Sequence, residues 1–359
     1  MKQMSKKYRV GIVGCGGMGR SHAKAYDNNP ATEVVAVADV YQESAEKLAS
    51  EHSVSAIYTD YNQMFEKEDL DILSVPTWQG VRAEITVAAA NSGIKGILGE
   101  KPMSASLGQA NDMVEACEKN GTKLAIGHQG RFSPTTNEIR RLVADGAIGQ
   151  PTMLYHRAKT NAGLLNTGTH AIDGWRYMLS DPETLWVIGQ TSRFSDRWER
   201  RSACEDLCMG LVCFEGGTRA VYEGDLPEPK IPMPSIYGTE GQIKVSSGGV
   251  IQAGTILLLN QKESDWQEIE PAPVETNQVQ ELIDWMEGKV DEHRSSGRQA
   301  RYTIEIMMAI YESLRINNVV NMPLETRESP LDLMIEDGTL VVTKEGRYDI
   351  RKPFPEEKK

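Results

Sequence analysis

The first third of the chain alternates short apolar runs with amphipathic stretches. Continuous apolar runs rich in β-branched residues predict strands buried on both faces, and the segments between them have helical spacing. The expected strands are Tyr8–Val13, Val34–Ala38, Asp71–Val75, Gly96–Gly99 and Lys123–Gly127, and the expected helices are Ser21–Asn28, Gln42–His52, Arg82–Ser92 and Leu107–Asn120. This order predicts a doubly wound parallel α/β domain, which we assign to residues 1–130.

After Pro134 the pattern changes to period 2. A helix expected at Asn137–Asp145 precedes alternating segments separated by glycine turns at Gly216–Gly217 and Gly248–Gly249. The alternating segments are Thr152–Arg157, Leu207–Phe214, Arg219–Glu223, Gln242–Val245 and Thr255–Leu259, and helical spacing returns at Val279–Met286 and Gln299–Ile316. The pattern predicts an α+β domain over residues 131–325, with an open, mostly antiparallel sheet.

Residues 326–359 are expected to form a charged C-terminal tail. One hairpin is predicted within it, pairing Leu340–Val342 with Tyr348–Ile350 around Gly346.

Charge and composition narrow the possible partners. The formal net charge of −12 over 359 residues disfavours nucleic acid as a partner. The apolar run Val10–Val13 is too short for a signal sequence or a membrane span, so we expect no membrane association, a mature protein that begins here, and a cytoplasmic location.

The five cysteines fit a reducing compartment, because their number is odd and no CxxC pair occurs. The spacing Cys204-x3-Cys208-x4-Cys213 could suggest a metal site, but apolar residues alternate with these cysteines. Buried strand cysteines are therefore the favoured interpretation, and no metal is expected.

A phosphate-binding pattern follows the first strand directly, in Gly14-Cys15-Gly16-Gly17-Met18-Gly19. In such a loop Gly14 permits the tight turn, Gly16 lets the backbone approach a pyrophosphate, and Gly19 lets the helix pack on the strand. The pyrophosphate would lie at the N-terminus of the following helix, with Met18 in the same loop. The strand, loop and helix occur in the required order, so a dinucleotide site is predicted.

Asp39 ends the second strand, twenty residues after Gly19. A carboxylate there can bind both ribose hydroxyls of NAD and would repel the extra phosphate of NADP. We therefore expect NAD as the cofactor. The alternative interpretation is a strand-end cap, and Tyr41 and Gln42 would not exclude a phosphate by charge.

The strand Gly96–Gly99 ends in Glu100-Lys101-Pro102, where ligands collect at the carboxyl edge of a parallel sheet. Further signals are the glycine loop, Gly168-x-His170-x-x-Asp173, and a later stretch running from Asp284-Trp285 through His293-Arg294 to Glu305 and Ala309. From about residue 8 to residue 324 the sequence resembles the Gfo/Idh/MocA oxidoreductases. The resemblance implies a Rossmann domain, then an α/β domain whose open sheet holds the substrate against the nicotinamide. It also implies a homodimer or higher homo-oligomer, with the open face buried between subunits.

The resemblance implies roles for three residues. Lys101 would lie near both the nicotinamide and the substrate hydroxyl, with Glu100 beside it among the cofactor contacts. His170 would be the general base, since an imidazole that titrates near neutrality can accept the hydroxyl proton. Without the resemblance, His170 would more often cap or pack a helix.

Three departures from the family pattern stand out. Asn166 occupies a position where many members have Asp, and Arg82 replaces a common His. Asp173 is the candidate substitute partner for His170, although it could instead cap the helix or form a salt bridge. The short link Ala158–Gly163 predicts an open pocket, suited to a bulky glycoside or to a site completed by a neighbouring subunit.

The positions of other polar residues predict their roles. Asn166 and His128 are expected substrate contacts, and Arg131 is expected to be structural. Tyr155 and His156 alternate along a strand, so only one can line the pocket; Tyr155 is the expected contact. His22 is expected to pack in a helix, Lys159 could face the substrate, His52 and His293 look solvated, and Trp78 could stack on a ligand or cover the core.

These residues predict an NAD-dependent dehydrogenase acting on a ring hydroxyl of a sugar, glycoside or polyol, C3 being one candidate position. Lys101 would position and polarise the oxygen while His170 accepts the proton. One alternative is a glycosidase or lyase that keeps its NAD and oxidises the substrate only transiently. Another is a non-catalytic NAD-binding regulator, which the presence of both Lys101 and His170 disfavours.

Overall fold

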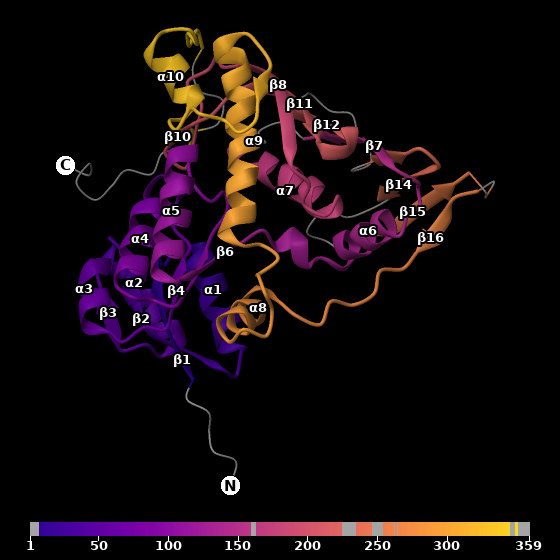
Figure 1. Ribbon diagram of the computed structural model, residues 1–359. Coiled ribbons are helices and arrows are strands. Elements are labelled where there is room, and N and C mark those ends of the chain that lie inside the picture. Colours follow the sequence, from indigo (N-terminus) through magenta and orange to yellow (C-terminus); the bar gives the residue numbers. More distant parts are fainter. Residues whose placement is uncertain are drawn as a thin grey trace.

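The computed structural model describes residues 7–158, 163–224, 235–245, 254–261, 263, 265–344 and 349–350. The chain is built around two large sheets, and helix α9 (Gly297–Ile316) runs between them (Figure 1). Within those ranges no helix is both long and apolar enough to cross a bilayer. The link residues 159–162, Lys159 among them, and the turn at Gly248–Gly249 fall outside the described residues.

The first sheet is parallel throughout, in the order β3-β2-β1-β4-β5-β6. Its strands are β1 (Tyr8–Val13), β2 (Thr32–Ala38), β3 (Ala56–Tyr58), β4 (Ile72–Val75), β5 (Gly96–Gly99) and β6 (Lys123–Ile126). Its helices are α1 (Gly17–Asp27), α2 (Gln42–His52), α3 (Tyr61–Lys67), α4 (Gln79–Asn91) and α5 (Leu107–Asn120). The expected Rossmann arrangement is confirmed, and the strand order reverses between β1 and β4, where such sheets bind ligands.

Strand β3 and helix α3 were not predicted from the sequence pattern. Strand β3 is three residues long and none of them is fully buried, so it lacks the apolar run that marks its neighbours.

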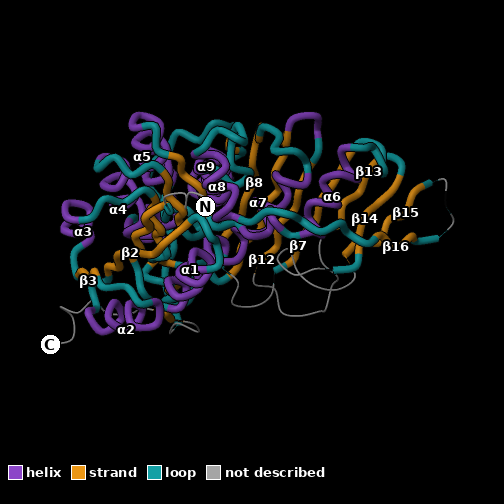
Figure 2. The backbone as a smooth tube through the Cα atoms, turned by 90° about the horizontal axis from the view of Figure 1, so that it is seen from below, coloured by secondary structure: helices purple, strands orange, loops and turns teal. Residues whose placement is uncertain are grey.

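The second sheet has the order β16-β15-β14-β13-β7-β12-β11-β8-β17 (Figure 2). Its strands are β7 (Pro151–Arg157), β8 (Thr184–Ser192), β11 (Leu207–Phe214), β12 (Arg219–Gly224), β13 (Ser235–Gly238), β14 (Gly241–Val245), β15 (Ile256–Asn260), β16 (Gln267–Ile269) and β17 (Val320–Asn321). All neighbours are antiparallel except β7 and β12, which pair in parallel. The mostly antiparallel sheet is confirmed.

Strand β8 was not expected, although it is central to this half. Gly189 interrupts its alternation because helix α9 packs directly against it, and a Cβ on Gly189 would overlap the backbone of Ile310. The expected turn at Gly216 and Gly217 does form, with φ of 76° and 84°.

Helices cover one face of the second sheet. Helix α7 (Thr169–Met178) packs against both α6 (Pro134–Ala144) and α9, and α9 packs on β8 and β11. Helix α8 (Gln278–Met286) instead packs on β5 and β6 of the first sheet. The opposite face leaves Ile188, Met209 and Tyr237 exposed by 42%, 50% and 42%, so this sheet is open on one side.

The hairpin expected in the tail does not form, and Tyr348 lies outside the described residues. Leu340–Val342 is not a strand, and a short helix, α10 (Pro330–Glu336), precedes it. Asp349–Ile350 (β18) instead pairs with β9 (Trp198–Glu199), which also pairs with β10 (Ser202–Ala203). A strand far away in sequence therefore replaces the expected local partner.

Candidate active site

The N-terminus of helix α1, which directly follows the glycine loop, is open to a ligand. Gly14 has φ of 103°, and a Cβ on Gly19 would overlap the carbonyl oxygen of Gly14. Apart from the adjoining backbone, no atom of the described residues lies within 4 Å of the Cβ positions of Gly16 and Gly17. Helix α1 has no side-chain cap and no acidic residue in its first turn. Its free N–H groups and open approach therefore fit a pyrophosphate, and Met18 is partly exposed beside them.

Asp39 is fixed beside this loop at the end of β2. Its Oδ2 accepts from the backbone N–H of Cys15 at 2.7 Å, and its Oδ1 accepts from that of Tyr41 at 2.9 Å. The carboxylate thus acts as a strand-end cap, and it also places a negative charge at the edge of the nucleotide crevice.

Glu100 is buried directly after β5 and is engaged within the protein. Its Oε1 lies 3.0 Å from Nε2 of His22, and its Oε2 accepts from the backbone N–H of Lys101 at 3.1 Å. His22 also lies 2.7 Å from Ser74 Oγ, so the expected packing histidine connects α1, β4 and β5. Burial raises the pKa of Glu100, but His22, Arg82 and Lys101 outweigh it and leave the pKa below its ordinary value.

Arg82 connects the loops that follow β4 and β5. It is buried in α4 and donates to the carbonyl oxygens of Thr77 and Pro102, and to that of Met103 at 3.4 Å. Burial lowers the pKa of Arg82 to about 10, and the charge of Glu100 opposes that shift. The arginine found in place of the common histidine therefore holds the backbone that directly follows Lys101 against the loop after β4.

Lys101 reaches a π-helical turn, Leu164–Gly168, that precedes α7. Its Nζ donates to the carbonyl oxygen of Asn166 at 3.2 Å. The main chain of Asn166, rather than its amide, therefore meets the lysine. Burial lowers the pKa of Lys101, and Arg200 lowers it further. Single π-helical turns occur frequently at functional sites.

A buried carboxylate holds the start of this turn. Glu205 accepts from the backbone N–H of Leu164 at 2.6 Å and from the hydroxyl of Tyr311 at 2.7 Å. Burial raises the pKa of Glu205. The only sequence signal was an acidic pair, Glu205-Asp206, before an apolar strand, and our sequence reasoning missed it.

His170 lies in the first turn of α7, one helical turn after Asn166. Its ring centroid is 6.3 Å from that of His128, edge to face. Burial lowers the pKa of His170 to about 3, with further lowering by the charges of Lys101 and His128. His170 is therefore neutral at physiological pH and near enough to Lys101 to be affected by its charge.

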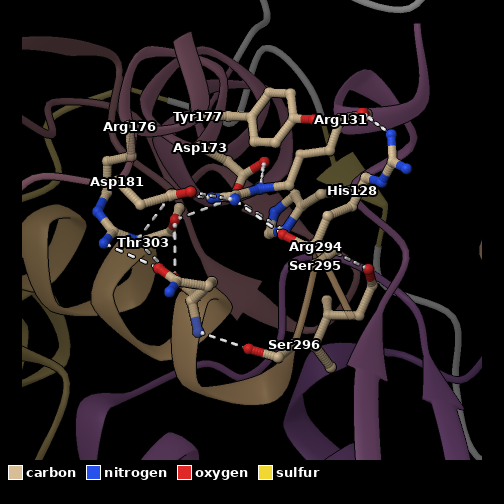
Figure 3. A network of polar contacts seen from close by, with 12 residues as sticks. His128, Arg131, Asp173, Arg176, Tyr177, Asp181, Arg294, Ser295, Ser296 and Thr303 are labelled. Atoms are coloured by element: carbon tan, nitrogen blue, oxygen red, sulfur yellow. Dashed lines mark hydrogen bonds and ion pairs between the residues drawn. The ribbon is translucent and has the colours of Figure 1, made fainter. Parts of the chain in front are cut away.

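The proposed pairing of Asp173 with His170 is not what the structure shows. Both oxygens of Asp173 bind Arg131, at 2.9 to 3.0 Å, and Oδ1 also accepts from Thr303 at 3.3 Å. Among the described residues no hydrogen bond joins Asp173 to His170. Asp173 points toward the turn Gln129–Phe132 and toward α9 because a buried guanidinium requires a carboxylate there (Figure 3).

Arg131 is at the centre of this buried network, as its expected structural role predicts. It also binds Asp181 at 2.8 Å and donates to the carbonyl oxygen of Arg294 at 2.9 Å (Figure 3). The network fastens α7, which carries His170, to the segment following β6 and to the segment preceding α9. Burial raises the pKa of Asp173, but Arg131 and His128 outweigh it, so the pKa is lowered.

His128 is enclosed rather than open to a ligand. It is 1% exposed, its Nε2 lies 2.9 Å from Thr169 Oγ1, and its Nδ1 lies 3.4 Å from Asp173 Oδ1. Burial lowers its pKa. His128, which was expected to contact the substrate, therefore lies beside His170 and contacts the side chain of Thr169, the residue before His170.

Tyr155 and His156 do lie on opposite faces of β7. Among the described residues, neither side chain has a hydrogen bond or ring contact with Lys101 or His170. His156 stacks on Tyr222 with ring centroids 5.8 Å apart and faces Trp175 of α7, so it is a core residue. Tyr155 points to the other face, away from α7, and its hydroxyl donates to Glu223.

His293, expected to be solvated, is buried. The rings of Phe132 and Trp285 lie 5.5 and 6.4 Å from it, and its Nδ1 accepts from the backbone N–H of Ser295 at 3.0 Å. The cysteines at 204, 208 and 213 are buried thiols, as expected. In the described part of the chain, no group of three or more His, Cys, Asp or Glu residues is arranged to hold a metal ion.

Comparison with known proteins agrees with this architecture. Residues 8–128 match the Gfo/Idh/MocA family model, described as an oxidoreductase family with an NAD-binding Rossmann fold. The chain is 24% identical to D-apiose dehydrogenase from Paraburkholderia graminis over 363 residues, covering 93% of this chain and 95% of that protein. It is 28% identical to inositol 2-dehydrogenase from Salmonella typhimurium over 185 residues, covering 48% and 55%.

Among solved structures, the aldose-aldose oxidoreductase from Caulobacter crescentus, complexed with glycerol, superimposes with a TM-score of 0.75 at 21% identity. The match covers 88% of this chain and all of that one, which extends the shared fold through the second sheet. The part of the chain that forms the first sheet thus matches the Gfo/Idh/MocA oxidoreductase family model, and most of the chain shares its fold with the aldose-aldose oxidoreductase.

Proposed function

We propose that this chain is an NAD-dependent dehydrogenase that oxidises a ring hydroxyl of a sugar, glycoside or polyol, C3 being one candidate, with Lys101 and His170 as its catalytic pair. The observation that carries the proposal is the convergence of two distant segments. Lys101 Nζ bonds to the backbone one helical turn before His170, at the carboxyl edge of the parallel sheet. Relatives that act on apiose and inositol support the substrate class.

The cofactor's place follows from the residues that fit it. The open N-terminus of α1 would hold the pyrophosphate, with Gly14, Gly16, Met18 and Gly19 around it. Asp39 would accept hydrogen bonds from the ribose hydroxyls and disfavour NADP. When bound, NAD supplies the acceptor for the hydride.

Lys101 and His170 divide the remaining chemistry. The Lys101 ammonium would donate to the substrate oxygen and polarise it, so that the hydroxyl loses its proton more readily. His170 has its pKa lowered to about 3 and is therefore neutral, with one ring nitrogen free to accept that proton. A base of low pKa is weak, and the charge of Lys101 on the substrate oxygen compensates for this weakness.

The surrounding residues would position the pair. Glu100 and Arg82 fix the turn that carries Lys101, and Asp173, Arg131 and His128 fix the helix that carries His170. We therefore assign Asp173 and His128 to positioning rather than to catalysis or substrate contact. Asn166 is half-buried, and its side-chain amide remains a proposed substrate contact.

We also propose a homodimer or higher homo-oligomer that covers the open face of the second sheet. Ile188, Met209 and Tyr237 lie exposed on that face, and burying them between subunits would be favourable.

A cofactor-release and turnover experiment tests the proposed reaction. NADH formation is followed at 340 nm with polyols, aldoses and glycosides, for the wild type, Lys101→Met and His170→Asn. We expect one class to reduce NAD and both variants to lose at least a hundredfold in kcat while still binding NADH. Retained activity in Lys101→Met would refute the catalytic pair. Cofactor that stays bound through turnover, with aglycone released and no free NADH, would favour a redox-cycling glycosidase or lyase.

A further inference from the structure

Among the described residues, one carboxylate oxygen of Glu199 is buried without a hydrogen-bond partner. Glu199 ends strand β9, just before the turn Arg200–Arg201 of the hairpin β9–β10, and it is 3% exposed. Its Oε1 accepts from Nη2 of Arg197 at 2.6 Å, so the oxygen without a donor is Oε2. Burying a polar atom without a partner costs free energy, so such an atom requires an explanation.

The neighbouring carboxylate, Glu205, is used differently. It is also buried, and its two oxygens accept from the backbone N–H of Leu164 and from the hydroxyl of Tyr311. Arg197 connects the two acidic residues, because its Nη1 donates to the carbonyl oxygen of Glu205 at 2.7 Å. Glu205 and Arg197 therefore hold the start of the turn Leu164–Gly168, and Oε2 of Glu199 takes no part in these contacts.

Oε2 of Glu199 lies next to the start of the turn that Lys101 reaches. A Cβ on Gly163 would lie 3.1 Å from this oxygen and would overlap Sγ of Cys204, so position 163 has no room for a side chain that covers it. The carbonyl oxygen of Gly163 accepts two backbone N–H groups of the turn, at 2.8 and 3.3 Å. Asn166, whose carbonyl oxygen binds Nζ of Lys101, lies one turn further on. Glu199 and Lys101 thus meet the two ends of one helical turn, which typically rises about 5.4 Å.

Helix α4 also connects Glu199 with Lys101. At its start, the buried side chain of Gln79 donates to the carbonyl oxygen of Glu199 at 3.5 Å. One turn later, Arg82 donates to the carbonyl oxygen of Pro102, the residue after Lys101. Burial is the main cause of the lowered pKa of Lys101, and the negative charge of Glu199 opposes that shift. Contacts from two separate elements therefore place the carboxylate of Glu199 near the proposed reaction site.

We propose that Oε2 of Glu199 accepts a hydrogen bond from a second hydroxyl of the substrate, while Lys101 and His170 engage the hydroxyl that is oxidised. This inference rests on the proposed function, because it assigns the reacting hydroxyl to that pair. A carboxylate accepts hydrogen bonds and donates none, so its partner must be a donor. Hydroxyls on one sugar ring or polyol chain are spaced closely enough to reach both ends of the turn. Glu199 is thus a specificity-determining residue, because an analogue without the second hydroxyl leaves its buried oxygen unpaired.

The test compares sugars and polyols with analogues that lack one hydroxyl. Glucose, xylose and myo-inositol are each assayed beside their monodeoxy forms, with NAD reduction followed at 340 nm. The enzymes are the wild type, Glu199→Gln, Glu199→Asp and Asp196→Asn. Glu199→Gln keeps an acceptor for Arg197 but removes the charge, and Glu199→Asp keeps the charge but shortens its reach. Asp196→Asn is the matched control, because it removes one negative charge from the same segment at a side chain that is 45% exposed.

We expect one monodeoxy analogue to lose at least about tenfold in kcat/KM with the wild type, mostly through KM. Glu199→Gln should lower kcat/KM for the parent compound about 10- to 100-fold and leave that analogue within about twofold, since its hydrogen bond is already absent. Glu199→Asp should show the same selective loss, and it decides the matter if Glu199→Gln does not fold. Asp196→Asn should keep the wild-type ratio of parent to analogue.

Two results would overturn the inference. An equal loss for the parent compound and every analogue in Glu199→Gln would assign Glu199 to folding through Arg197. A parent compound that Glu199→Gln oxidises with wild-type kcat/KM would show that no substrate hydroxyl binds this carboxylate.

A binding measurement separates this inference from the proposed reaction. If no sugar or polyol reduces NAD, the same compounds are titrated calorimetrically into protein loaded with NADH. Binding that is lost both for one monodeoxy analogue and in Glu199→Gln would support the hydroxyl site even though the proposed dehydrogenase function had failed. Binding that Glu199→Gln leaves unchanged, or absence of binding by every compound, would overturn the site.

Discussion

The buried carboxylate of Asp173 gives the sharpest stability prediction. It is 2% exposed and binds Arg131, which is fully buried, through three contacts of 2.9 to 3.0 Å. Asp173→Asn keeps the shape of the side chain but removes its charge. Breaking a buried ion pair typically costs about 3–5 kcal/mol, because the remaining charge is buried without compensation.

Arg131 would keep one anionic partner, so the lower end of that range applies. Asp181 remains 2.8 Å away, and we expect a loss of about 3 kcal/mol. For a domain of roughly 150–250 residues, that loss lowers the melting temperature by about 6–12 °C. Asp145→Asn is the matched control, since its ion pair with Arg141 is exposed and should contribute less than about 1 kcal/mol.

Thermal unfolding followed by circular dichroism checks this at two pH values. The folded pKa of Asp173 is lowered, so its contribution is fully present above its unfolded pKa, near 4, and is lost as pH falls through the folded pKa. The difference between wild type and Asp173→Asn should therefore be the same at pH 7 and pH 5. A variant that melts within 2 °C of wild type at both pH values would refute the assigned ion pair.

Four further outcomes follow from the site. Arg82→Met leaves three main-chain carbonyls without this donor and frees the turn of Lys101, so kcat should fall about a hundredfold while NADH binding, measured by fluorescence, is unchanged; an unaltered kcat would contradict this. Because the pKa of His170 is lowered to about 3, kcat/KM should lose no activity to its protonation between pH 7 and pH 5; a limb near 6.5 would oppose its role. Gly19→Ala should weaken NAD binding more than tenfold by calorimetry, since its Cβ would overlap the glycine loop, and native affinity would argue against that loop as the site. Asp39→Ser should improve the NADP-to-NAD ratio of kcat/KM at least tenfold, and an unchanged ratio would assign Asp39 to capping alone.

The sequence determined the features that depend on local pattern. Continuous apolar strands and short-range motif spacing predicted the parallel sheet, the glycine loop and the positions of Asp39 and Lys101 at strand ends. Period-2 segments predicted the open second sheet. These features need only the residues within one strand–loop–helix unit, so they can be predicted without knowing what packs against it.

Tertiary structure decided which groups meet. Asp173 binds Arg131 rather than His170, and Lys101 meets the backbone of Asn166, because segments far apart in sequence pack at one edge of the sheet. The same packing buries His293 and lowers the pKa of His170 to about 3. It also pairs the C-terminal strand with the hairpin of Arg200. Hydrogen-bond partners, burial and charge environment depend on long-range packing, which the local order of residues does not specify.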